Sequence, residues 1–188
     1  YLIHLIIFVA FPVVFSFVLM FHEWDIISPM KYVGLKNFSH LLQDRLFFRS
    51  LYNTIVFIVI HIPLQIAIAL LLAEFLNQKI RLRTFFRAAY FLPVVISGVV
   101  VTIVWQQLYG YDMGLLNRIL IELGLGRVGW LVNPNLAMPS IAIMATWKNV
   151  GLYVVLFLVG LQSVPLYYYE AADIDGASHW QKFRYITL

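Results

Sequence analysis

Four long runs of apolar residues constrain this chain more than any other feature of its sequence. Residues 1–21 and 88–109 contain no Asp, Glu, Lys or Arg, and the runs at about 53–76 and 139–165 contain one charged residue each. A helix of ~20 such residues, at ~1.5 Å rise per residue, spans the ~30 Å hydrocarbon core of a bilayer. The sequence therefore predicts four transmembrane segments.

These segments are expected to be helices and not strands of a membrane barrel. Barrel strands are ~10-residue stretches of alternating polarity, whereas these runs are continuously apolar. Composition agrees, since 62% of the residues are hydrophobic and 12% are charged, against about 45–50% and about 25% in soluble domains. Each run contains a proline, which membrane helices tolerate as a kink. The predicted fold is an all-α membrane protein with four transmembrane helices.

Positive charge is concentrated between the second and third runs. The stretch NQKIRLRTFFR, residues 77–87, has four basic residues and no acid: Lys79, Arg81, Arg83 and Arg87. Short loops rich in Lys and Arg stay on the cytoplasmic side. This turn, the N-terminus and the segment after the fourth run are therefore predicted to be cytoplasmic. The net charge of +4 is attributed to membrane topology, and no nucleic-acid partner is expected.

The sequence lacks convincing motifs for catalysis, metal binding or nucleotide binding. It has no cysteine, its five histidines are scattered, and no lysine precedes Ser or Thr as a phosphate-binding loop requires. GLGRVG, residues 124–129, has the glycine spacing of a dinucleotide-binding turn, but it follows a helical stretch and not a strand. No catalytic residue and no metal ligand is assigned. Any ATP that powers the protein must bind to another chain.

Three polar residues of the second run share one stripe of the predicted helix. Asn53, His61 and Gln65 are separated by multiples of four residues, and such residues lie on one helix face. Polar groups in a span face the bundle interior or a water-filled route. Two interpretations remain open: hydrogen bonds between helices, and the lining of a substrate path. An intramembrane enzyme would need paired catalytic groups, and His61 alone is insufficient.

A lysine lies within the fourth run. Lys148 precedes Pro165 by 17 residues, or about 25 Å of helix, which predicts a position near the outer interface. There its amino group would extend to the headgroups while its stem stays in the apolar layer. The alternative is a role at the mouth of a substrate path or in contact with an external partner. Asn149 beside it is a second candidate for the path.

The segment at 167–188 differs from the apolar runs because it has acids first, then a glycine, then bases. Its pattern predicts a first helix over 167–175, ended by Gly176 in the left-handed conformation. Ser178 and Gln181 have the spacing of a capping box that starts a second helix. Trp180, Phe183 and Thr187 would share one face of that helix. Docking into a groove and lying on lipid headgroups both fit this pattern.

The same segment resembles the EAA motif of ABC importer permeases, E-A-A-x3-G-x9-I-x-L-P. The residues that match the motif, with every spacing kept, are Glu170, Ala171, Ala172, Gly176, Ile186 and Leu188. Asp173, which directly follows the second alanine, is the seventh residue assigned to this site. Shorter blocks are also similar to the carbohydrate-uptake branch of MalF-like and UgpA-like permeases, among them YVGLKNFSHLL, FLPVVIS, GLLN and GLQSVP. The resemblance covers nearly the whole chain. It implies that these seven residues couple the protein to an ATPase.

Membership of this family would imply a partial permease domain, with the last two of six helices missing beyond residue 188. The EAA segment would form coupling helices that sit in a cleft of a cytoplasmic ABC ATPase dimer. The resemblance further implies a heterodimer with a second permease, a solute-binding protein that delivers sugar, and a bacterial or archaeal cytoplasmic membrane. ATP and Mg²⁺ would bind to the ATPase. This chain would bind no cofactor and would not itself be an enzyme.

A secondary transporter or channel of another family is the alternative function. Such a protein carries its own coupling groups, commonly acids within the membrane. The sequence offers little for this role, since Glu74 lies at the cytoplasmic end of its run.

Overall fold

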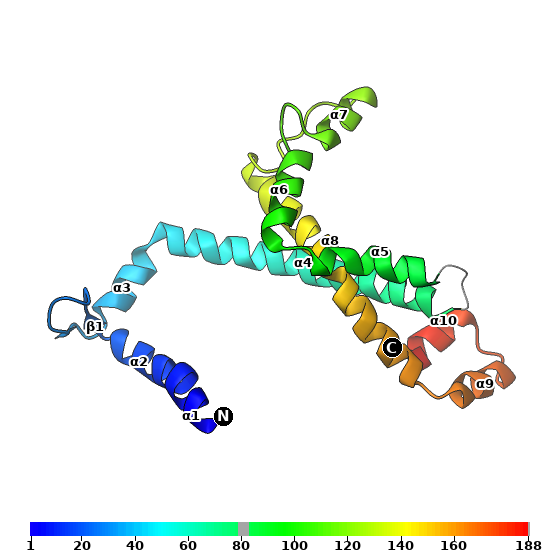
Figure 1. Ribbon diagram of the computed structural model, residues 1–188, viewed down its shortest axis with the longest axis horizontal. Coiled ribbons are helices and arrows are strands. Elements are labelled where there is room, and N and C mark those ends of the chain that lie inside the picture. Colours follow the sequence, from blue (N-terminus) through cyan, green and yellow to red (C-terminus); the bar gives the residue numbers. More distant parts are fainter. Residues whose placement is uncertain (79–82, 188) are drawn as a thin grey trace. The chain divides into compact units, whose positions relative to one another are not determined.

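The computed structural model describes residues 1–78 and 83–187, and of residues 83 and 84 only the backbone. The chain divides into two units, Tyr1–Thr54 and Ile55–Leu188, which are described separately. One helix, α4 (Arg45–Asn77), begins in the first unit and continues into the second (Figure 1). Lys79 and Arg81, on which the predicted cytoplasmic turn partly depends, lie outside the described residues.

The first unit begins with one continuous helical stretch. It consists of α1 (Leu2–Leu5), the π-helical turn η1 (Ile6–Ala10) and α2 (Phe11–Leu19). The π turn ends two residues before Pro12, which has no backbone N–H to donate. The wider i→i+5 pattern accommodates this proline without ending the helix.

A short strand pair and a helix follow in the first unit. β1 (His22–Glu23) pairs antiparallel with β2 (Lys31–Tyr32), a small exception to the all-α prediction. α3 (Lys36–Gln43) comes next. The Asn37 amide on α3 donates to the carbonyl oxygens of Met20 at 3.1 Å and His22 at 3.0 Å. This side chain therefore fixes α3 against the end of α2.

Helices make up the second unit after α4. They are α5 (Arg83–Val95), α6 (Gly98–Leu108), α7 (Leu115–Glu122), α8 (Pro134–Ser163), α9 (Leu166–Ile174), α10 (His179–Lys182) and the π turn η2 (Phe183–Thr187). Figure 1 shows α7 and α9 at opposite ends of the long helix α8. The start of α5 and the end of α8 adjoin, because Arg87 and Gln162 line one cavity of about 490 Å³.

The buried core of the second unit lies between α4 and α8. α4 contributes Ala69, Ala73 and Leu76, and α8 contributes Val150, Val154, Leu158 and Leu161. Small residues let membrane helices approach closely, which increases their van der Waals contact. Gly151 on α8 has this effect toward α5, since a Cβ there would lie 2.3 Å from the Tyr90 carbonyl oxygen.

The third apolar run is not the single helix, kinked at its proline, that the sequence predicts. The structure has α5 and α6 in its place, bent by 100° at the break between Val95 and Gly98. Pro93 removes one backbone donor near the end of α5. Ser97 is then extended, with φ −54° and ψ 138°, and starts α6 as its N-cap. The prediction failed because an uncharged run contains no signal that separates a kinked helix from a broken one.

Three helices among the described residues are long and apolar enough to cross a membrane: Leu2–Leu19, Arg45–Asn77 and Pro134–Ser163. The bent pair α5 and α6 makes a fourth candidate. The predicted ranges 1–21, 53–76 and 139–165 overlap these helices, but α4 begins eight residues earlier and α8 five residues earlier than predicted. Apolar side chains along all of them remain exposed, as expected for helices in contact with lipid or other helices.

Candidate functional site

Residues 167–187 fold as two helices joined at Gly176. That glycine has φ +75°, a left-handed conformation that is unstrained only without a Cβ. The Ala177 N–H donates to the Ala172 carbonyl at 2.9 Å and the Gly176 N–H donates to the Asp173 carbonyl at 3.1 Å. These two bonds form a Schellman motif, which satisfies the last carbonyls of α9. The predicted glycine break is confirmed.

The predicted capping box is also confirmed at the start of α10. The Gln181 N–H donates to Ser178 Oγ at 3.3 Å, and the Ser178 N–H donates to Gln181 Oε1 at 2.7 Å. Each side chain thereby satisfies a backbone N–H that the first helical turn leaves without a partner. Both ends of the turn between the helices are thus fixed by local hydrogen bonds.

Two side-chain contacts tie the second helix back to the first. Lys182 Nζ lies 2.5 Å from Asp173 Oδ1, with 14% of the lysine side chain exposed. The hydroxyls of Tyr169 and Thr187 lie 3.0 Å apart. Thr187 therefore turns toward α9. Because of these contacts, α9, α10 and η2 form one ordered body.

The motif residues are unevenly exposed on this body. Glu170, Ala171, Asp173 and Gly176 are exposed, whereas Ala172 and Ile186 are half-buried. Leu188 lies outside the described residues. Apolar side chains are exposed beside the motif, with Ile174 at 86% and Trp180 at 69%. Exposed apolar side chains next to a carboxylate can bind another protein.

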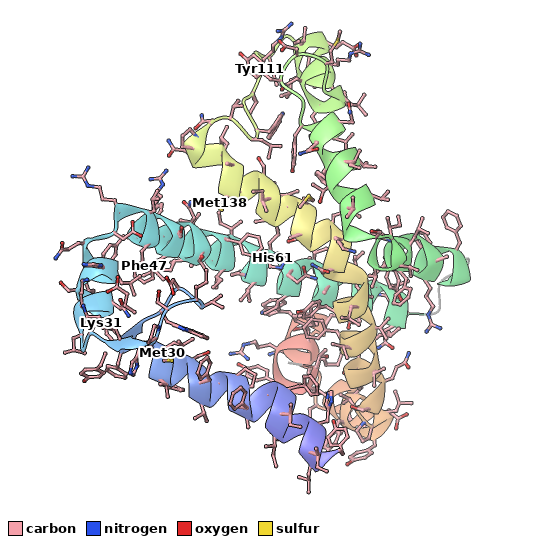
Figure 2. The ribbon with its side chains drawn as sticks, turned by 60° about the vertical axis from the view of Figure 1, so that its left-hand side comes forward. Met30, Lys31, Phe47, His61, Tyr111 and Met138 are labelled. Carbon is pink, nitrogen blue, oxygen red and sulfur yellow. The ribbon has the colours of Figure 1, made fainter. Side chains whose placement is uncertain are left out.

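One residue of the polar stripe on α4, His61, contacts α8. His61 Nδ1 lies 3.0 Å from Thr146 Oγ1 on α8, and the His61 ring stacks on Phe57 with centroids 4.9 Å apart. Figure 2 shows His61 where α4 passes α8. Asn53, half-buried, belongs to the first unit, so only the other two stripe residues are placed near α8. For His61, the interpretation as a contact between helices is confirmed.

Gln65 differs from its neighbour on the stripe. It is 3% exposed, and neither its Nε2 nor its Oε1 has a hydrogen-bond partner among the described residues. A buried amide without partners costs about 1–3 kcal/mol of desolvation on mutational scales. The side chain is therefore suited to pair with a polar group that another helix, water or a solute supplies.

Lys148 is hydrogen-bonded to backbone carbonyls at the break between α5 and α6. It lies midway along α8, and its Nζ donates to the Ile96 carbonyl at 3.0 Å and to the Pro93 carbonyl at 3.4 Å. The position of Lys148 near the outer interface stays a prediction, because its distance from the end of α8 is as the sequence gives it. Asn149 is half-buried and donates to the Ala145 carbonyl of its own helix at 3.0 Å.

Sequence reasoning missed the role of Asn117 on α7, which holds the connection that follows this helix. Asn117 is fully buried, and its Nδ2 donates to the carbonyls of Tyr111 at 3.0 Å and Val128 at 2.9 Å. Its Oδ1 accepts from the Val128 N–H at 3.0 Å and the Trp130 indole at 3.1 Å. GLLN, residues 114–117, was the only sequence signal. Tyr111 lies at this end of the unit in Figure 2.

The geometry offers contacts for partners, not reaction chemistry. No group of three His, Asp or Glu side chains that could hold a metal ion occurs in the described part of the chain. What the second unit presents is an ordered helical pair with an exposed Glu170, joined to α8 through Val164 and Pro165.

Several known proteins are similar to this chain. A "Probable ABC transporter permease protein" of Pyrococcus horikoshii is 37% identical over 185 residues, covering 97% of this chain and 63% of that protein. The "Trehalose/maltose transport system permease protein MalF" of Thermococcus litoralis is 35% identical, covering 97% of this chain and 62% of that protein. The chain thus spans less than two thirds of the length of these relatives.

A solved structure is similar along the whole chain. It is the crystal structure of a bacterial alginate ABC transporter in complex with an alginate pentasaccharide-bound periplasmic protein. The TM-score is 0.80 at 26% sequence identity, over 100% of this chain and 62% of that chain. Residues 45–188 also match one protein family. The chain belongs to that family, the binding-protein-dependent transport system inner membrane components.

Proposed function

We propose that this chain is part of a permease subunit in an ATP-driven, binding-protein-dependent sugar importer. The ordered stretch 167–187 carries the proposal, because it holds Glu170, Ala171, Ala172 and Gly176 in a fixed shape with Glu170 exposed. Docking of this segment into an ATPase would move α8, to which only two residues connect it. The permease would form half of the translocation pathway.

The partners follow from the same proposal. A cytoplasmic ABC ATPase dimer binds ATP and Mg²⁺, and a second permease completes the pathway as a heterodimer. A solute-binding protein outside the membrane delivers the sugar. Support comes from the relatives, which include a permease named for trehalose and maltose and a transporter bound to a periplasmic protein with an alginate pentasaccharide.

The membrane orientation is also part of the proposal. The 167–188 segment and the basic turn between α4 and α5 face the cytoplasm, and the loop around Asn117 faces outward. Arg87 near the start of α5 and Gln162 near the end of α8 line the same cavity, so both segments lie at one end of the unit. The excess of basic residues in the turn supports the cytoplasmic side for that end.

Polar residues in α4 and α8 are proposed to line the pathway. They are Asn53, His61, Gln65 and Asn149; the amino group of Lys148, the fifth candidate from the sequence, is instead bonded to the Pro93 and Ile96 carbonyls. Gln65 supports this best, because its buried amide can donate and accept hydrogen bonds as a sugar hydroxyl requires.

Substitutions in the full-length protein test the docking role. We expect Glu170→Lys and Gly176→Trp to abolish co-purification of the ATPase and sugar uptake, while both variants still insert into the membrane. Glu122→Lys is the matched control, since Glu122 is an exposed acid at the opposite end of the unit. Normal uptake and co-purification in both variants would refute the docking role. Uptake by the wild type without any ATPase would instead favour a self-coupled transporter.

The substrate class needs a separate measurement. The solute-binding protein that works with this permease should bind oligosaccharides, disaccharides or glycerol 3-phosphate in a direct binding assay. Binding of amino acids or metal ions alone would contradict the assignment to sugar import.

A further inference from the structure

The break between α5 and α6 leaves backbone carbonyls that the helices themselves do not satisfy. In an unbroken helix the Pro93 carbonyl would accept from residue 97, but Ser97 is extended. α6 begins with the bond from the Val101 N–H to the Ser97 carbonyl, so the Ile96 carbonyl precedes its hydrogen-bonding pattern. Carbonyls of this kind are costly in an apolar layer, where water does not replace the lost donor.

Lys148 supplies the missing donor from a different helix. Its Nζ reaches both carbonyls, at 3.0 Å for Ile96 and 3.4 Å for Pro93. A cation at the carboxyl end of a helix is also favourable, because the aligned peptide dipoles leave partial negative charge there. The lysine therefore stabilises the end of α5, and the carbonyls solvate its charge at mid-helix depth.

A second contact fixes the position of α8 one turn further along. Gly151 approaches α5 so closely that a Cβ would lie 2.3 Å from the Tyr90 carbonyl oxygen. A step of three residues along α8, from 148 to 151, corresponds to a step of three residues back along α5, from 93 to 90. The two helices thus run antiparallel in a fixed register, and that register places the Lys148 amino group at the break.

We propose that Lys148 is a positioning residue that holds the bend between α5 and α6. It does so as a charged cap supplied by α8. This inference rests on the proposed function in one respect: α8 continues from Lys148 to Ser163 and then connects to the 167–188 segment. A displacement of that segment by an ATPase would reach the break through α8 and the lysine. The angle of α6 would then respond to the ATPase.

A distance measurement between α5 and α6 tests the positioning role without any transport assay. The 188 residues contain no cysteine, so spin labels can be attached at Phe85→Cys and Gln107→Cys after any cysteine in the remainder of the full-length protein is replaced. With the 100° bend the two backbone sites are on the order of 20 Å apart, against roughly 33 Å in a straight helix. We expect a narrow, short distribution in the wild type and in Lys148→Arg.

Removing the charge should change that distribution. In Lys148→Met we expect a broader distribution whose mean shifts by several ångströms toward the straight-helix value. Ile143→Met, which adds a methionine at an exposed position of α8, should leave it unchanged. If Lys148→Met does not accumulate in membranes, Lys148→Gln replaces it, because the shorter, uncharged amide cannot reach both carbonyls. An unchanged narrow distribution in these charge-free variants would overturn the proposal.

Uptake kinetics separate this role from direct contact with sugar. We expect Lys148→Met to lower the maximal uptake rate by about tenfold, with the half-saturating sugar concentration and ATPase co-purification unchanged, and Lys148→Arg to restore the rate. Loss of uptake with an unaltered α5–α6 distance would overturn the positioning role and make Lys148 a pathway residue. If the wild type imports no sugar, the proposed function fails, while the distance measurement still decides the role of Lys148.

Discussion

At the scale of single residues, Gly151 controls how closely α5 and α8 pack. The Tyr90 carbonyl leaves no room for a side chain there, so Gly151→Ala must push the helices apart. We expect a loss of about 1–3 kcal/mol in the free energy of unfolding, the usual cost of overpacking. Thermal unfolding in detergent, followed by circular dichroism, would report it as a lower midpoint.

Gly160 on the same helix is the matched control for that substitution. Nothing lies within 4 Å of a Cβ at Gly160 among the described atoms. Alanine there should be neutral or stabilise by up to ~1 kcal/mol through helix propensity. Equal midpoints for the two variants would show that the close approach at Gly151 does not limit packing.

Asn117 controls the order of the loop between α6 and α8. Asn117→Ala removes the acceptor of the Val128 N–H and the Trp130 indole, and each unpaired buried donor costs about 1–3 kcal/mol. We expect faster amide hydrogen exchange and faster trypsin cleavage at Arg118 and Arg127, with α4 and α8 unaffected. Gln107→Ala, at an exposed site nearby, is the control. Unaltered exchange in Asn117→Ala would contradict this role.

Sequence reasoning succeeded for residues whose roles depend on near neighbours. The left-handed Gly176 and the Ser178–Gln181 capping box follow from spacings of a few residues. The partners of Lys148 and Asn117 were missed because they lie 6 to 55 residues away in the chain, outside any helix-spacing rule. A single sequence does not show which backbone carbonyls, distant along the chain, will accept hydrogen bonds from a lysine or an amide side chain.

At the scale of elements, the ion pair between Asp173 and Lys182 joins α9 to α10. Asp173→Lys and Lys182→Asp would each place like charges together and loosen the joint. We expect each single variant to weaken ATPase association by up to about 1 kcal/mol, roughly fivefold, as for a partly exposed pair. The double variant exchanges the charges and should restore association to within about twofold of the wild type.

The charge exchange also distinguishes two roles of Asp173. If the carboxylate contacts the ATPase directly, the double variant should bind as poorly as Asp173→Lys alone. Quantitative pull-down of the ATPase by the full-length permease in detergent measures both cases. If the double variant does not restore ATPase association, Asp173 contacts the ATPase directly and its role is not limited to the ion pair with Lys182.

Element boundaries were predicted less well than element type. The helical nature of the apolar runs follows from their continuous hydrophobicity. The starts of α4 and α8 fall earlier than predicted because helix continues past the apolar core into polar residues, where hydropathy carries no information. The break at Ser97 was missed for the opposite reason, since apolar residues without a charge lie on both sides of it.

At the scale of the whole molecule, the fold predicts which loops share a side of the membrane. Single cysteines at Asn77 and His179 should react with a membrane-impermeant maleimide only after cells are permeabilised, and one at Leu123 should react in intact cells. Val154→Cys is the control, because Val154 is fully buried and should stay unreactive in both conditions. Labelling of Asn77→Cys and His179→Cys from opposite sides would contradict the arrangement of α5 and α8.

The membrane class and family of the chain could be predicted from sequence because they rest on composition and on one long, spaced motif. The partners that cover the exposed apolar helices could not, since surface complementarity is a property of two folded chains. Gln65 illustrates the limit: its position on a polar stripe was predictable, but its unpaired state depends on how α4 meets α8.

The left-handed turn at Gly176 has a consequence for how fast and how tightly another protein can bind. Local bonds already fix α9 and α10 relative to each other, so little conformational entropy remains to be lost on association. Preorganised surfaces of this kind bind through their contacts alone, without a folding step that slows the encounter. A left-handed residue other than glycine would be strained by the order of 1 kcal/mol. That strain would favour other backbone conformations in the free protein. Association would then be slower, because the partner could bind only the fraction of molecules in the left-handed conformation.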